Sequence, residues 1–323
     1  MTAAVPEAVR LLAVPIAGRE TASSRLRLHD LVASLPGRFA PTIVRPRDDA
    51  DLYRHDPGQF DVVYVQKDAR PAVVDFCRKA ADAGVPIVYD IDDDFGTWPD
   101  MAEKAMCGLA DTVTVDSRGR ASELRNHTKA EPFVMPCMID LANEPARPGL
   151  RPPRRDVAKV ASFGNRVSLR NTVSYLAAVP EPIGTYVIGP PDVGDELPGL
   201  RLVPFSLGAF IGDLLPADVF VLAHGEQEAP LKDNNRLIMA MSLGVPSIVS
   251  PSPAYLEVLT GLGLDWLACR PGEVGERLAQ LADPSVRGEA GRIGFEHAWA
   301  NYRPERCASL FASVLDAAGA QAS

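Results

Sequence analysis

The sequence lacks the features of a membrane protein, a disulfide-linked protein and a nucleic-acid binder. No apolar run approaches the roughly 20 residues of a membrane span, and the N-terminus shows no basic-then-apolar signal pattern. The five cysteines are scattered without a C-x-x-C pair, which favours reduced, buried thiols. The net charge is -9, whereas general nucleic-acid binding needs a basic surface. We therefore expect a cytoplasmic protein without nucleic-acid or integral membrane association.

Two common nucleotide-binding signatures are also missing. No G-x-G-x-x-G follows an expected strand and no G-x4-G-K occurs, so we expect neither a nicotinamide cofactor nor a P-loop. What is present is the composition of a globular protein, with 46% hydrophobic and 23% charged residues. The length of 323 residues accommodates two domains, each with its own core.

Apolar strands alternate with amphipathic helices along most of the chain, which is typical of parallel, doubly wound sheets. The alternation stops in a stretch rich in proline and arginine and then resumes. We predict two Rossmann-like α/β domains facing across a cleft. Their predicted boundaries are 1–144 for the first domain, 145–156 for a linker, 157–300 for the second domain and 301–323 for a terminal helix.

The strongest candidate site follows the predicted buried strand Asp218–Ala223. A predicted helix comes next, with Asp233 as its N-cap and with Lys232, Asn235 and Arg236 in or beside its first turn. Backbone N–H groups and the helix dipole favour an anion there, and two cationic side chains add to this. The pattern predicts a diphosphate-binding pocket, although a solvated helix face is the simpler alternative.

Other candidates also follow predicted strands. The run Asp92, Asp93 and Asp94 could bind sugar hydroxyls, supply a base or attract a cationic acceptor, but it also suits a solvated turn. We expect no divalent metal there, since no calcium loop with a glycine follows. Gly164 and Asn165 either let a phosphate or sugar approach closely or form only a tight turn.

Two further groups are open to both a functional and a structural interpretation. The hydroxyls and the guanidinium of Ser23, Ser24 and Arg25 lie where a helix should begin, so they either cap that helix or line an acceptor site. His224 lies at a strand end, where it is a candidate ligand.

The sequence resembles the GT-B glycosyltransferases, particularly the large retaining group that uses nucleotide-diphosphate sugars. The run from Lys232 to Pro246 (KDNNRLIMAMSLGVP), followed by SPSPAYLE from Ser250, looks like that group's donor-binding motif. The stretches YDIDD from Tyr89 and SSRLR from Ser23 are similar to parts of the group's first domain. The closing helix is similar to one that crosses back onto the first domain in this fold.

The resemblance implies a reaction and a set of residue roles. The reaction is transfer of a sugar from a nucleotide-diphosphate donor to a small soluble acceptor, with retention favoured and no cofactor. Diphosphate binding is assigned to Lys232, Asn235, Arg236, Gly164 and Asn165, and nucleoside binding to Gly189, Pro204, Phe205 and Glu257. Catalysis is assigned to Glu226, Glu228, Asp92 and Asp93, and acceptor or sugar binding to Ser23, Ser24, Arg25, Asp94 and His224.

One departure from the group is visible. Its Glu-x7-Glu pair has a second member that binds the donor ribose, and Met239 takes that place here. The first member falls near Glu226 or Glu228. Three alternatives therefore stay open: a nucleotide-sugar 2-epimerase, a non-catalytic binding or scaffold relative, and an enzyme that couples a non-sugar cyclitol. Assembly as a homodimer is also open.

Overall fold

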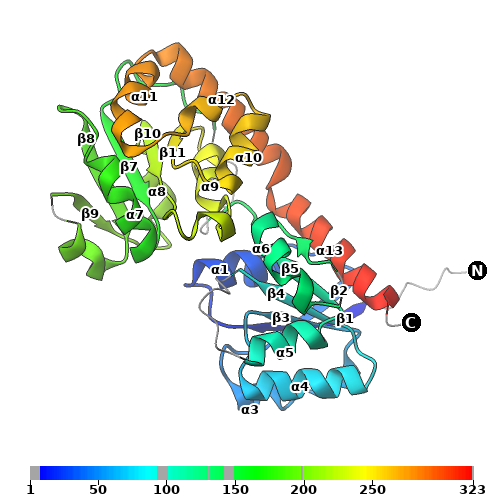
Figure 1. Ribbon diagram of the computed structural model, residues 1–323. Helices are drawn as coiled ribbons and strands as arrows, with labels where there is room; N and C mark the ends of the chain where they lie inside the picture. The colour runs from blue at the N-terminus through cyan, green and yellow to red at the C-terminus, as the bar shows by residue number, and fades with distance from the viewer. Residues whose placement is uncertain (1–7, 93–100, 130, 142–148, 198, 322–323) are drawn as a thin grey trace, which may run out of the picture. The chain divides into compact units, whose positions relative to one another are not determined.

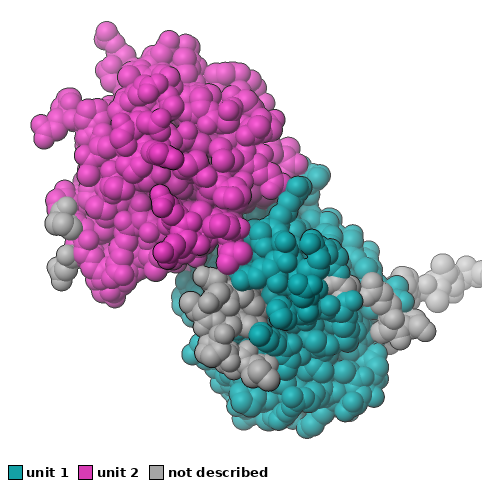
Figure 2. All heavy atoms as spheres, in the orientation of Figure 1, with its two compact units in different colours: residues 1–138, 303–323 teal, residues 139–302 magenta. Residues whose placement is uncertain are grey.

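A computed structural model describes residues 8–92, 101–129, 131–141, 149–197 and 199–321. It divides the chain into two compact units (Figures 1 and 2). Unit 1 consists of residues 1–138 and 303–323, and unit 2 of residues 139–302. Both are doubly wound parallel α/β sheets, which confirms the predicted fold class.

Unit 1 is built on a six-stranded sheet in the order β2-β1-β3-β4-β5-β6, and every described pairing is parallel. The strands are β1 (Val9–Pro15), β2 (Phe39–Ile43), β3 (Val62–Gln66), β4 (Ile87–Ile91), β5 (Thr112–Val115) and β6 (Phe133–Val134). Alternate residues enter opposite cores. In β1, Leu11 and Ala13 join one apolar cluster while Leu12 and Val14 join the other. The inner strands are therefore mostly apolar rather than alternating, with Gln66, Asp90 and Thr114 as buried polar exceptions.

Helices cover both faces of this sheet (Figure 1). They are α1 (Ala22–Ser24), the π-helical turn η1 (Arg25–His29), α2 (Asp30–Ala33), α3 (Asp49–Leu52), η2 (Pro57–Gln59), α4 (Pro71–Asp82), α5 (Met101–Leu109), α6 (Arg118–Leu124), η4 (Arg125–His127) and α13 (Pro304–Gln321). Although α13 follows all of unit 2 in the chain, it packs into unit 1. Its Phe311 is buried, and its ring centroid lies 4.6 Å from that of Tyr64 in β3.

Unit 2 has a five-stranded parallel sheet in the order β11-β10-β7-β8-β9. The strands are β7 (Lys159–Phe163), β8 (Gly184–Gly189), β9 (Arg201–Pro204), β10 (Val219–Leu222) and β11 (Ser247–Val249). The helices are α7 (Arg166–Leu176), η5 (Pro191–Glu196), α8 (Phe210–Leu214), η6 (Ala229–Leu231), α9 (Asn235–Ser242), α10 (Pro253–Gly261), η7 (Asp265–Leu267), η8 (Pro271–Glu273), α11 (Val274–Leu281) and α12 (Pro284–Asn301).

Close packing against α12 holds α9 in place. A Cβ on Gly291 of α12 would lie 2.3 Å from the carbonyl oxygen of Gly244, just beyond α9, and one on Gly294 would lie 2.9 Å from Met241 Cγ. Trp299 Nε1 donates to the carbonyl of Ser242, at 2.9 Å. Glycines in α12 therefore let it approach the end of α9 more closely than other residues could.

Two predicted strands are shorter or absent. The apolar run 133–138 predicts a strand, but β6 ends at Val134, and Pro136 has no N–H with which to continue a ladder. The sequence of residues 265–268 also predicts a short strand, but the structure has the 3-10 turn η7 there, followed by a single bridge between Val249 and Ala268. In the part of the chain that the structure describes, no helix has the length and apolar character needed to cross a bilayer. The five cysteines are all free and buried.

Candidate functional site

The sheet of unit 2 reverses its strand order between β7 and β10. From β7 the chain proceeds outward to β8 and β9, and then returns to build β10 and β11 on the other side. Ligands of open α/β sheets bind outside the carboxyl ends of the strands at such a point. The residues that follow β7 and β10, Gly164-Asn165 and Ala223-His224, are therefore placed where a ligand is expected.

Arg236 lies across this point. Its NH2 donates to the carbonyl of Ala223 at 2.6 Å, and its NH1 reaches the carbonyl of Phe163 at 3.5 Å. One guanidinium thus contacts the ends of both central strands. Gly164 makes room for it: with φ at +148°, an added Cβ would lie 3.4 Å from Arg236 Cδ and 2.9 Å from Ser168 Cβ. A side chain at position 164 would displace these neighbours.

His224 is fixed through its backbone N–H, one ring nitrogen and one face of its ring. Its backbone N–H donates to Ser250 Oγ at 2.9 Å, and its Nδ1 lies 3.0 Å from Ser252 Oγ. The ring stacks on Tyr255 with centroids 4.2 Å apart. Burial, followed by the charges of Arg236 and Lys232, lowers the pKa of His224 to about 2, so the imidazole is neutral. Two cations and a neutral ring thus occur together at the end of β10.

The start of α9 differs in detail from the prediction. Asn234, not Asp233, occupies the N-cap position, while Asp233 Oδ1 accepts the N–H of Asn235 at 3.2 Å. Lys232 forms an ion pair with Glu228 at 3.7 Å, and both side chains are partly exposed.

Asn165 has a structural role at the start of α7. Its side chain caps this helix by accepting the N–H of Ser168 at 2.9 Å. The cap occupies the side-chain oxygen, so a contact between Asn165 and a phosphate would have to use its backbone or its amide nitrogen.

The residues assigned to the nucleoside lie at the ends of β8 and β9. The carbonyl of Gly189 accepts the N–H of Phe205 at 2.7 Å. A Cβ on Gly189 would lie 2.4 Å from Leu169 Cδ1, so the backbone there packs closely. The ring of Phe205 is 36% exposed and rests edge-on against Phe210. The position of Met239, by contrast, is in the core of the unit, with 5% of the residue exposed.

The structure therefore brings most of the predicted donor residues to one edge of the unit 2 sheet: Gly164, Asn165, Gly189, Pro204, Phe205 and Arg236. His224, which was predicted to bind the acceptor or the sugar, lies at the same edge. Lys232 and Asn235 adjoin them at the start of α9. Glu226 lies exposed in the connection between β10 and α9, and Glu257 is exposed on α10.

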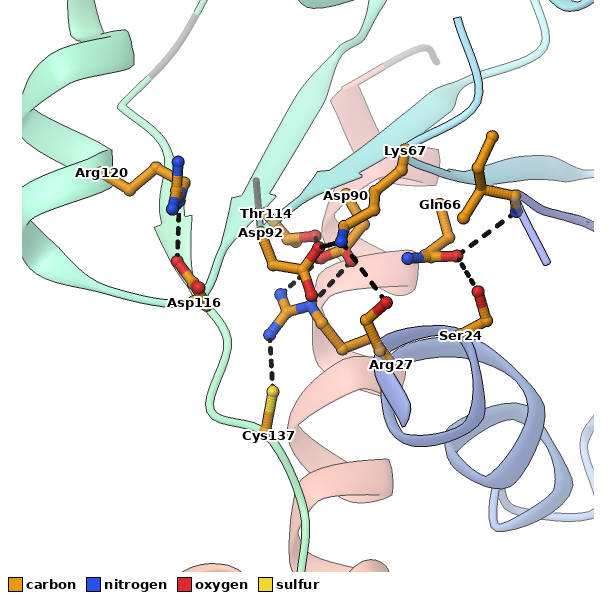
Figure 3. A network of polar contacts seen from close by, with 12 residues as sticks. Ser24, Arg27, Gln66, Lys67, Asp90, Asp92, Thr114, Asp116, Arg120 and Cys137 are labelled. Carbon is orange, nitrogen blue, oxygen red and sulfur yellow. Dashed lines mark hydrogen bonds and ion pairs between the residues drawn. The ribbon is translucent and has the colours of Figure 1, made fainter. Parts of the chain in front are cut away.

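Unit 1 has its own polar network at the corresponding sheet edge (Figure 3). Arg27 Nε and NH2 donate to the two oxygens of Asp90 at 2.8 and 2.5 Å, and Thr114 Oγ1 donates to the same carboxylate at 2.6 Å. All three side chains are buried. Sequence reasoning missed this set, although a carboxylate inside the apolar run PIVYDI requires a buried partner. The network is satisfied within the unit, which makes it structural.

The residues predicted for the acceptor are placed differently from one another. Ser24 is buried and donates to Gln66 Oε1 at 3.0 Å, while Arg25 is buried with its NH1 on the carbonyl of Arg19 at 2.7 Å. Ser23 and Asp92 lie nearer the surface, where both contact Lys67. Asp93 and Asp94 lie outside the described residues. Within the described ranges, no group of three His, Cys, Asp or Glu side chains could hold a metal ion.

This architecture is that of the GT-B glycosyltransferases. Solved structures of that fold share it over almost the whole chain. HepE of Anabaena, in complex with UDP-glucose, has 11% identity and a TM-score of 0.69, covering 95% of this chain and 99% of that chain. A glycosyltransferase from Rickettsia africae has 10% identity and a TM-score of 0.72, covering 96% and 98%. The T4 phage enzyme BGT, with UDP-glucose, has 10% identity and a TM-score of 0.62, covering 95% and 100%.

No protein-family model matches the sequence, and no curated protein matches it either. The identities to the solved structures are low, so the likeness defines the GT-B fold alone.

Proposed function

We propose that this protein is a glycosyltransferase that moves a sugar from a nucleotide-diphosphate donor to a hydroxyl or amine of a small acceptor. The observation that carries the proposal is Arg236, held across the strand-order reversal of unit 2 with Lys232 and a neutral His224 beside it. This group of residues supplies positive charge at the start of a helix, which suits a diphosphate.

The chief chemical demand of the reaction is negative charge on the departing diphosphate. Hydrogen-bond donors that are already oriented toward such charge stabilise it without reorganising. This stabilisation usually contributes more to catalysis than any other effect. Two backbone carbonyls orient the guanidinium of Arg236, so it meets that condition. We propose that the anomer is retained, in which case the leaving phosphate itself takes the acceptor's proton. No metal or other cofactor is then required.

The nucleoside is proposed to lie toward β8 and β9. The partly exposed ring of Phe205 offers an apolar surface for a base. Because position 239 is a methionine buried in the core, the ribose cannot be held by a carboxylate there. Uracil is the first base to test, since HepE and BGT were solved with UDP-glucose.

The test is calorimetric titration of the full chain with UDP, GDP and ADP, in buffer containing EDTA. We expect one of these nucleotides to bind and Arg236→Ala to weaken that binding at least about tenfold, equivalent to ~1.4 kcal/mol. Arg292→Ala is the matched control, because Arg292 is an exposed arginine of α12 paired with Glu289 and Glu296 in its own helix. Equal affinities for wild type and Arg236→Ala would disprove the diphosphate assignment.

The loss of a carboxylate at position 239 favours one second candidate, a binding protein without turnover. The transferase and the binding protein are distinguished by measuring the release of UDP from UDP-glucose by the wild-type protein. A transferase releases UDP and does so faster with a suitable acceptor, whereas a scaffold binds the donor unchanged.

A further inference from the structure

Two serines in the connection between β11 and α10 contact His224, which follows the neighbouring strand β10. Because β10 and β11 are parallel neighbours, the residues after both strands meet at the same edge of the sheet. Ser250 Oγ accepts the backbone N–H of His224 at 2.9 Å, and Ser252 Oγ lies 3.0 Å from the ring nitrogen Nδ1. The backbone and the ring of His224 are thus each held by a serine of their own.

Ser252 is used differently from most serines at its position. It occupies the N-cap of α10, where a serine usually accepts an N–H of the first helical turn. Its side chain makes no such capping bond. The hydroxyl is therefore available to the ring of His224.

The contact with Ser252 determines which ring nitrogen of His224 carries the proton. Ser252 is 1% exposed, and within the described part of the chain Nδ1 of His224 is the one hydrogen-bond partner of its hydroxyl. A buried O–H needs an acceptor, so it donates to Nδ1, which then carries no proton. Burial, followed by the charges of Arg236 and Lys232, lowers the pKa of His224 to about 2, so the ring is neutral. Its single proton is therefore on Nε2.

Nε2 is the ring nitrogen that remains for a ligand. It has no hydrogen-bond partner among the described residues, and His224 is partly exposed. Tyr255 covers one face of the ring and so fixes its plane. The ring also lies close enough to Arg236 and Lys232 to be affected by both charges. An uncharged N–H beside two cations suits an anionic oxygen, since it adds a donor without adding repulsion between like charges.

We propose that Ser252 fixes His224 with its proton on Nε2, and that this N–H binds an oxygen of the diphosphate of a nucleotide-sugar donor. The inference rests on the proposed function, which supplies the ligand, and it adds two residues to Arg236. Ser252 is a positioning residue, and His224 is a binding residue that donates without being charged. The resemblance assigns His224 to the acceptor or the sugar instead and gives Ser252 no role.

The position of the proton is measured by long-range ¹H–¹⁵N NMR of the histidine rings in the full chain without ligand. The chain has five histidines, and the spectrum of His224→Gln identifies the signals of His224 by their absence. We expect the proton on Nε2 alone in wild type and a mixture of both tautomers in Ser252→Ala. Ser252→Thr, which keeps the hydroxyl, should restore the wild-type spectrum. A proton on Nδ1 in wild type, or an unchanged ring in Ser252→Ala, would overturn the proposal.

The contact with the ligand is measured by calorimetric titration of the full chain with UDP-glucose, GDP-glucose and ADP-glucose. The amide of glutamine can place an N–H near the position of Nε2, whereas the shorter amide of asparagine reaches only the position of Nδ1. For the nucleotide sugar that binds, we expect His224→Asn and Ser252→Ala to weaken binding about fivefold, the effect of one hydrogen bond. His224→Gln should retain most of the affinity. His127→Asn, at an exposed histidine of unit 1, is the control and should equal wild type.

The binding results separate this inference from the proposed function. Affinity that falls in Arg236→Ala but is equal in wild type, His224→Gln and His224→Asn would disprove the histidine contact and leave the diphosphate assignment intact. If wild type binds none of the three nucleotide sugars, the proposed function and the ligand contact both fail. The ring spectrum, recorded without ligand, then decides alone whether Ser252 orients His224.

Discussion

At Arg236 a cation is oriented by backbone carbonyls rather than by a carboxylate. A carboxylate partner would neutralise the charge, whereas carbonyl oxygens of Phe163 and Ala223 direct the guanidinium and leave its full charge available. Lys67 differs, because its ammonium forms an ion pair with the carboxylate of Asp92. The arrangement at Arg236 is therefore suited to an anion.

The neutral state of His224 has a measurable consequence for stability. Its pKa in the folded protein is about 2, well below its usual 6.5, because burial and two cations disfavour the charged form. Below about pH 6.5 the unfolded chain binds a proton that the folded chain does not, so stability is lost as the pH falls through that value. For wild type this loss is about 2 kcal/mol from about pH 7.5 to about pH 5.

His224→Gln removes this ionisable group and keeps a side-chain amide. We expect the variant to lose about 2 kcal/mol less stability than wild type over the same pH interval. Urea unfolding of both proteins at the two pH values measures the difference. Parallel pH dependence in the two proteins would show that His224 is not held neutral.

At the scale of elements, the position of α9 depends on its contact with α12. Gly291→Ala would put a Cβ 2.3 Å from the carbonyl oxygen of Gly244, which is backbone and cannot move aside as a flexible side chain can. We expect a loss of about 1–3 kcal/mol in stability and weaker UDP binding, since α9 carries Arg236. Differential scanning calorimetry and UDP titration report the two effects.

The matched control is Gly275→Ala in α11, where an added Cβ meets no atom within 4 Å. That substitution should be neutral or stabilise by up to about 1 kcal/mol, because alanine favours a helix over glycine. If both variants behaved alike, the close approach of α12 to the end of α9 would not be what positions α9.

The elements themselves can be predicted from the sequence to a large extent. Hydrophobic periodicity identifies the inner strands and most of the long helices. A strand buried on both faces gives a continuous apolar run, and a helix buried along one stripe gives apolar residues at helical spacing. The short helix α3 is missed, although Asp48 caps it by accepting the N–H of Asp51. Four-residue helices leave too little periodicity to detect.

The side-chain partners in the sites could not be predicted. Arg27 and Asp90 are 63 residues apart, and they meet only because β4 lies inside the sheet next to β3 and β5. Strand order is a property of the whole fold and is not encoded in any one segment. The same holds for Lys67, whose left-handed backbone and pairing with Asp92 depend on the ends of two strands.

At the scale of the whole molecule, each unit has its own core, so a core substitution should destabilise only the unit that contains it. Phe311→Ala removes a buried ring of α13 that packs on Tyr64, and we expect it to destabilise unit 1 by about 3–5 kcal/mol. Val286→Ala, at an exposed position of α12, should change little, within about 0.5 kcal/mol. Limited proteolysis with mass spectrometry shows which unit is cut. Simultaneous loss of protection in both units would contradict independent cores.

The return of α13 to unit 1 has a consequence for how the protein is made. Residues 139–302 are contiguous, so unit 2 can complete its core as soon as they have left the ribosome. Unit 1 lacks part of its core until α13 emerges, because Phe311 and its neighbours belong to the cluster that covers one face of its sheet. We therefore expect the first half of the chain to be synthesised to be the last to finish folding, with one apolar face of its sheet uncovered until α13 arrives.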